Sequence, residues 1–125
     1  MTLERAAQGV VEAVVVYDGR LLLVDAQDGW GLPSGAPELA ETPEATAARL
    51  VYELTGYLAD GSTLLRPADA RADTRSAVVC QLLSQDPSTQ GRFTPEQLRW
   101  VPLAEAINSG LPETVRDYLE GHTPV

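Results

Sequence analysis

Lysine is absent from the sequence, and the nine basic residues, all arginines, face eighteen acidic ones, which gives a net charge of -9. A chain this acidic lacks the basic stripe that binds the phosphate backbone of DNA or RNA. The same charge disfavours anionic membrane surfaces. We therefore expect neither a nucleic-acid polymer nor a membrane as a partner. A small phosphorylated ligand stays open, since a bridging metal or a local arginine cluster would hold it.

Long hydrophobic runs are also missing. No apolar stretch approaches the roughly 18 residues that suggest a membrane-spanning helix. The first residues, from Met1 to Arg5, lack the basic and then apolar layout of a secretion signal. We therefore expect a cytoplasmic protein.

Cysteine and histidine occur once each. Cys80 cannot form an internal disulfide, and it lies in a strand-like run, 76–83, where a small buried hydrophobe is expected. A catalytic thiol would need a nearby histidine or a helix N-terminus. The histidine, His122, lies in the C-terminal tail, where we expect it to be solvated. The sequence therefore favours a structural role for Cys80.

The hydrophobic residues that are present, 44% of 125, come in organised runs that predict one domain over residues 1–125. The runs 9–17 and 20–25 flank Asp18-Gly19. This pair favours a tight β-hairpin, because both central positions of such a turn take positive φ. Residues 30–33 are expected to form a short strand, and residues 34–37 a turn.

A helix is predicted from Thr42 to Thr55. Thr42 suits the N-cap, Pro43 the first helical position, and Glu44 the positive end of the helix dipole. Gly56 is placed to end the helix in the left-handed conformation.

Further strands, loops and short helices complete the predicted fold. Strands are expected at 63–65, 76–83 and 98–103, loops at 66–74 and 84–95, and short helices at 103–108 and 112–120. The order β-β-β-α-β-β-β-α indicates an α/β (α+β) fold, in which helices pack on a mixed sheet.

Residues 35–57 carry a spaced set of glycine, charged and apolar residues. The pattern is Gly, five residues, Glu, seven residues, then Arg-Glu-aliphatic-any-Glu-Glu-any-Gly-aliphatic. The residues in register are Gly35, Glu41, Arg49, Val51, Glu53 and Gly56, with Tyr57 at the last apolar position. This segment resembles the Nudix box, and the preceding Leu-Pro-Ser-Gly is close to that family's usual Leu-Pro-Gly-Gly.

The upstream hairpin and the segment 96–103 extend the resemblance to the Nudix hydrolase (MutT-like) family over most of the chain. The resemblance implies a Nudix fold, with a mixed sheet sandwiched between helices. It also implies cleavage of a nucleoside diphosphate linked to another group. In the family, Mg²⁺ (or Mn²⁺) held by three helix glutamates neutralises the diphosphate and helps to generate the nucleophile.

The box is degenerate at those metal-binding positions. Residues i, i+3 and i+4 share one face of a helix, and here they are Leu50, Glu53 and Leu54. Mg²⁺ prefers oxygen ligands, and leucine offers none. Taken without the family, Ala47, Leu50, Val51 and Leu54 form an ordinary amphipathic stripe. We predict an apolar or refilled pocket, with residual metal binding as the alternative.

The resemblance assigns roles to the other box residues. Glu53, Glu41 and Arg49 are the candidate catalytic residues, and Glu41 is expected mainly to brace Arg49. Gly35 and Ser34 are candidate substrate-binding residues of the turn before the helix, where the serine makes the required backbone conformation harder to adopt than a glycine would.

Residues outside the box complete the candidate site. Arg99 is a candidate for binding a phosphate, and Glu96 is a candidate metal ligand beside Glu53. Solvation at the surface is the competing interpretation of Arg99. Trp30 and Trp100 suit stacking on a base, but core packing is the commoner use of large aromatics in strands.

Two functions therefore stay open. One is a divergent hydrolase in which Glu53 holds one metal, with Glu38, Glu41 or Glu96 replacing the lost acids. The other is a non-catalytic module that binds a ligand or a protein partner through a remodelled pocket, with no cofactor. The leucines favour weak or absent pyrophosphohydrolase activity. A monomer and a homodimer are both compatible with the sequence.

Overall fold

The structure is a computed structural model that describes residues 10–26, 29–65, 75–83, 91–108, 110–111 and 113–121. The predictions for residues 66–74, residues 84–90 and His122 lie outside the described residues. The elements are β1 Val10–Tyr17, β2 Arg20–Ala26, β3 Gly29–Gly31, β4 Ser34–Gly35, α2 Pro43–Thr55, β5 Ala59–Leu65, β6 Arg75–Leu82, the short 3-10 turn η1 Pro95–Gln97, β7 Leu98–Pro102, α3 Leu103–Ala106 and α4 Glu113–Glu120.

The predicted hairpin joins β1 to β2. Asp18 and Gly19 have φ values of 55° and 73°, which is the left-handed pair that a tight primed turn requires. The carbonyl of Gly19 also accepts a hydrogen bond of 3.0 Å from the amide of Leu103, the first residue of α3. The hairpin is therefore confirmed, and its tip is tied to a helix.

The sheet is mixed, and β1 lies at its centre. β1 runs parallel to β6 over six residue pairs, and β6 pairs antiparallel with β5 on its other side. β2 pairs antiparallel with β7 and β3. β1 and β2 pair only beside their turn, at Val16↔Leu21 and Tyr17↔Arg20, so the two strands diverge away from the hairpin tip.

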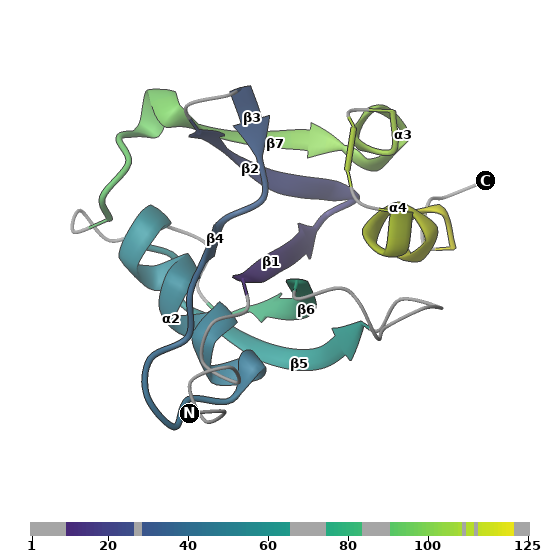
Figure 1. Ribbon diagram of the computed structural model, residues 1–125. Helices are drawn as coiled ribbons and strands as arrows, with labels where there is room; N and C mark the ends of the chain where they lie inside the picture. The colour runs from purple at the N-terminus through teal and green to yellow at the C-terminus, as the bar shows by residue number, and fades with distance from the viewer. Residues whose placement is uncertain are drawn as a thin grey trace.

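Helices cover both sides of this sheet, as Figure 1 shows, with α2 on one side and α3 and α4 on the other. The alternation of side chains along the strands explains this. Val11, Ala13 and Val15 of β1 belong to a buried cluster under α2, together with Leu50 and Val51 of that helix. Val14 belongs to a second buried cluster, under α3 and α4. A strand that is buried on both faces reads as a continuous apolar run. The predicted fold class, a mixed sheet sandwiched between helices, is confirmed.

The central helix, α2, has the predicted ends. The Thr42 hydroxyl accepts a hydrogen bond of 3.1 Å from the amide of Ala45, and Pro43 is the first helical residue. Gly56 ends the helix with φ 83°, and its amide donates to the carbonyl of Tyr52. This is the left-handed cap for which glycine is preferred.

A main-chain clasp, formed by residues 91–93, also closes the end of α2. The amides of Arg92 and Phe93 donate to the carbonyls of Glu53 and Leu54, at 2.8 and 2.9 Å. A Cβ at residue 91 would lie 2.5 Å from the carbonyl carbon of Thr55, so the approach requires glycine there. The clasp satisfies carbonyls that the end of a helix otherwise leaves without a partner.

Three predicted boundaries are wrong. Ser34 and Gly35, expected in a turn, form β4 and pair with β1. The strand expected at 30–33 is β3 and ends at Gly31, because the chain leaves β2 there to reach β4. β5 begins at Ala59 rather than at residue 63. Pairing with β6 overrides the weak strand preference of Asp60 and Gly61, and a register shift between Gly61 and Thr63 accommodates them.

Smaller differences concern the C-terminal helices, which end or begin within two residues of the predicted positions. Such shifts are normal at frayed helix ends. No helix within the described ranges combines the length and the apolar character needed to cross a membrane.

Candidate functional site

Arg49, on α2, fastens the turn that precedes the helix. Its Nε donates to Oε2 of Glu41 at 2.8 Å, and its Nη2 donates to Oε1 of the same carboxylate at 2.9 Å. Nη2 also donates to the carbonyl of Ala36 at 3.0 Å. The expected contact between Glu41 and Arg49 is present in the two-pronged form that a planar guanidinium prefers. Arg49 thereby ties residues 36–41 to the helix.

Glu41 is held as an anion at the centre of this network. Besides Arg49, it accepts hydrogen bonds from the amide of Glu38 at 2.9 Å and from the hydroxyl of Thr46 at 2.8 Å. The Arg49 hydrogen bond, followed by the Glu38 amide, lowers the pKa of Glu41 to about 2. The same pairing raises the pKa of Arg49. A carboxylate so stabilised is a weak proton acceptor near neutral pH, which favours a bracing role.

Glu53 lies one helical turn after Arg49 and pairs with the same guanidinium as Glu41. Nη1 of Arg49 donates to Oε1 of Glu53 at 3.1 Å, whereas Glu38 stands further off at 3.8 Å. The Glu53 side chain is 44% exposed. This carboxylate therefore faces solvent beside a cation, which partly neutralises it.

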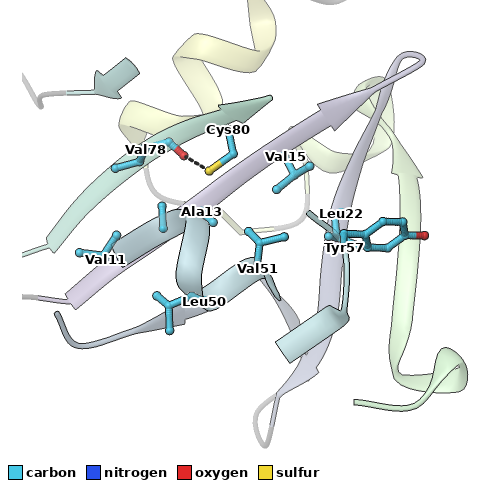
Figure 2. Close-up of a cluster of buried hydrophobic side chains, with 10 residues drawn as sticks. Val11, Ala13, Val15, Leu22, Leu50, Val51, Tyr57, Val78 and Cys80 are labelled. Carbon is cyan, nitrogen blue, oxygen red and sulfur yellow. Dashed lines mark hydrogen bonds between the residues drawn. The ribbon is translucent and has the colours of Figure 1, made fainter. Parts of the chain in front are cut away.

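The two leucines that replace box glutamates point into the protein. Leu50 is 6% exposed and Leu54 is 7% exposed. Figure 2 shows Leu50 among the aliphatic side chains of the cluster under α2, together with Val11 and Val51. A Cβ on Gly35 would lie 2.7 Å from a terminal methyl carbon of Leu50, so this leucine packs directly on the glycine of β4. At this position, therefore, a hydrocarbon side chain packs against Gly35.

This donor set does not fit Mg²⁺ or Mn²⁺. Within the described ranges, no three Asp, Glu, His or Cys side chains gather closely enough to hold a metal ion. The chemistry of the helix face explains why. Glu53 already shares Arg49, and its neighbours on the metal face are hydrocarbon. A small, strongly hydrated dication needs several oxygen ligands in a near-octahedral arrangement.

The other sequence-predicted residues are dispersed. Ser34 is exposed on β4, opposite Glu12 of β1. Arg99, on β7, lies over the ring of Trp30, with its guanidinium carbon 4.4 Å from the ring centroid. Such stacking stabilises the cation. Glu96 is exposed on η1. Hydrogen bonds and ion pairs join Glu41, Arg49 and Glu53, and none among the described residues joins Arg99 or Glu96 to them.

An aromatic group at the other end of α2 escaped the sequence analysis. Tyr57, the residue after the Gly56 cap, packs edge to face with Trp100, with ring centroids 5.6 Å apart. Trp100 also meets Tyr17 of β1 at 6.3 Å. The sequence pairs Trp100 only with Trp30 as a strand aromatic, for which core packing is the commoner use. The available signal was Tyr17, a large aromatic at the last position before the hairpin turn, but only the pairing of the strands brings it to Trp100.

The hairpin, the mixed sheet between helices and the capped helix with its Arg49–Glu41 brace define a single class of domain. A family model described as NUDIX domain matches residues 7–120. The chain therefore belongs to the Nudix domain family. A MutT-like protein from Streptomyces ambofaciens is 51% identical to it over 49 residues, which cover 38% of this chain and 32% of that protein. The match spans about a third of that relative's length.

Solved structures share the fold at low sequence identity. A Nudix hydrolase from Nitrosomonas europaea superimposes with a TM-score of 0.66 at 23% identity, covering 94% of this chain and 93% of that one. An ADP-ribose pyrophosphatase from Streptococcus suis gives a TM-score of 0.62 at 16% identity, covering 89% and 83%. A UDP-X diphosphatase gives 0.60 at 22% identity, covering 90% of this chain and 63% of that one. These similarities concern the fold.

Proposed function

We propose that this chain is a non-hydrolytic Nudix domain that binds a small ligand, and that its box helix acts as a structural element. The observation that supports this most is the burial of Leu50 and Leu54 at two positions where the family places metal-binding glutamates. The remaining acids fit a brace better than a reaction centre, since Glu41 is engaged by Arg49, Glu38 and Thr46.

A divergent metal-dependent hydrolase is the competing proposal. Membership of the Nudix family favours it, as does the fold shared with an ADP-ribose pyrophosphatase and a UDP-X diphosphatase. It requires Glu53 to hold a single metal, assisted by Glu38, Glu41 or Glu96. Glu53 is the testable residue in this proposal, because the proposal requires its carboxylate, which is 44% exposed, to hold the metal.

Metal titration and a hydrolysis assay on the same preparation separate the two proposals. Calorimetry with millimolar Mg²⁺ and Mn²⁺ is expected to show no saturable heat. ADP-ribose and UDP-glucose are expected to persist in the presence of either metal. The matched variants are Glu53→Gln and, as a control on the exposed face of α4, Glu120→Gln. Metal-dependent turnover that Glu53→Gln abolishes and Glu120→Gln retains would overturn the proposal.

Restoring the acids tests the cause of the loss. The double variant Leu50→Glu, Leu54→Glu returns the family's three carboxylates to one helix face. Metal-dependent turnover in the double variant, absent from the parent, would assign the loss to the two leucines. A folded double variant without turnover would mean that other parts of the site have also diverged.

A further inference from the structure

A cleft opens beside the hairpin tip, away from the Arg49–Glu41 network. Its volume is about 180 Å³, and it is lined by Tyr17, Asp18, Arg20, Tyr57, Leu82 and Trp100. Tyr57, Leu82 and Trp100 belong to, or pack against, the cluster under α2, so the cleft lies on the α2 side of the sheet. Three of its six lining residues are aromatic.

The aromatic wall is fixed before any ligand arrives. The indole Nε1–H of Trp100 donates a 3.1 Å hydrogen bond to the hydroxyl of Tyr57. Their rings stand nearly perpendicular, at 80°. Tyr57 is anchored in the core at 9% exposed, and Figure 2 shows it there together with Leu22, whereas Tyr17 is 43% exposed at the mouth. A prearranged wall reduces the ordering cost that a ligand would otherwise bear.

The hairpin tip also lines the cleft, and it too is held in place. The tight turn at Asp18 and Gly19 sets Tyr17 opposite Arg20, and the bond from the Leu103 amide to the Gly19 carbonyl fastens the turn to α3. The tip contributes Asp18 and Arg20 to the lining of the cleft. Asp18 carries hydrogen-bond acceptors and Arg20 carries donors, and their formal charges cancel.

We propose that this cleft binds a flat, uncharged heteroaromatic ring whose edge carries both hydrogen-bond donors and acceptors. The aromatic wall provides faces and edges for stacking, and base–aromatic stacking tolerates any planar ring. The size agrees, since a cavity of roughly 150 Å³ holds a benzene ring. The cancelled charges at the tip and the net charge of -9 disfavour a phosphorylated ligand here.

This inference deepens the proposed function, because it gives the non-hydrolytic domain a ligand class and a place to bind it. The cleft shares no lining residue with the box network of Arg49, Glu41 and Glu53. The two proposals therefore fail independently: hydrolysis of ADP-ribose would overturn the function alone, and an empty cleft would overturn this inference alone.

Nuclear magnetic resonance of the variant Trp30→Phe provides the test. Trp30 does not line the cleft, and its removal leaves Trp100 as the single tryptophan, so one indole N–H resonance reports on the cleft. The probes are adenine, uracil, dihydrouracil and AMP. Adenine and uracil are expected to shift this resonance saturably. Dihydrouracil, which keeps the polar edge without the aromatic ring, and AMP, which adds a phosphate, are expected to bind at least tenfold more weakly.

Substitutions in the cleft sharpen the test. In the Trp30→Phe background, Tyr17→Ala is expected to weaken adenine binding roughly tenfold, through loss of stacking. Leu82→Arg is expected to block the cleft, and Leu83→Arg, at the exposed neighbouring position, serves as its matched control. The inference is overturned if neither adenine nor uracil shifts the resonance saturably. It is also overturned if dihydrouracil binds as well as uracil, or if folded Tyr17→Ala binds adenine unchanged.

Discussion

The two ends of α2 differ in a way that reverses what the motif indicates. The box end carries the spaced charges that make the family recognisable, yet its side chains are satisfied by one another and its would-be metal face is hydrocarbon. The end at Gly56 carries only the last apolar position of the motif, Tyr57, yet it opens into a cleft with aromatic, acidic and basic residues. The comparison teaches that the charged residues of a motif can act as a structural brace, whether or not they also take part in chemistry.

The largest expected effect comes from removing the buried Leu50 side chain. Leu50→Ala removes a buried side chain that packs on Gly35 and on the cluster under α2. Such deletions typically cost about 2–5 kcal/mol of unfolding free energy, because a cavity is left behind. Urea unfolding measures the loss, with Leu39→Ala at a 92% exposed position as the control. A loss close to that of the control would mean that the box end is open, and the contrast between the two ends would disappear.

The next effect comes from breaking the brace. Arg49→Met keeps an unbranched, flexible stem but leaves the Glu41 carboxylate, whose side chain is 15% exposed, without its cation. Hydrogen bonds to charged groups contribute about 1.5–3 kcal/mol each, and solvent exposure reduces this, so we expect a loss of about 1–3 kcal/mol. Urea unfolding of Arg116→Met, on the exposed face of α4, supplies the comparison. Equal stability of the two variants would contradict a structural role for the network.

The smallest effect is a dependence on acid. The pKa of Glu41 is lowered in the folded state to about 2 from an ordinary value of 4.5. A depressed folded-state pKa gives stability that is present above the unfolded value and is lost as pH falls towards the folded value. Stability should therefore decline between about pH 4.5 and pH 2, and Glu41→Gln should show a shallower decline. Urea unfolding at stepped pH measures both slopes, with Glu120→Gln as the control. Parallel slopes for all three proteins would show that the brace does not hold a proton-sensitive charge.

Much of the fold was predictable because its signals are local. The turn at Asp18-Gly19, the cap at Thr42 and the stop at Gly56 each act within a few residues, and each is present. β4 was missed because two residues carry no periodic pattern, and their pairing with β1 is set by a partner distant in sequence. The start of β5 was missed for the same reason, since β6 imposes an extended conformation on Asp60 and Gly61.

In the candidate site, too, contacts within one segment were predictable and contacts between distant segments were not. The contact between Glu41 and Arg49 followed from the box resemblance, and the burial of Leu50 and Leu54 followed from side-chain chemistry. The cleft did not follow, because Tyr17, Tyr57 and Trp100 come from three separate segments, and no spacing in the sequence links them. The position of Arg99 over Trp30 likewise depends on how β7 and β3 flank β2.

The clasp at residues 91–93 has a consequence for how the protein assembles. The last carbonyls of α2 receive their donors from a segment that follows both β5 and β6 in sequence. The start of the helix can form from Thr42 and Pro43 alone, whereas its end is completed only when that distant segment returns. Long-range closures of this kind slow folding, because loop entropy is lost before the contact is gained. The final turn of α2 is thus expected to acquire protection from hydrogen exchange later during refolding than the first, with Gly91 controlling the delay.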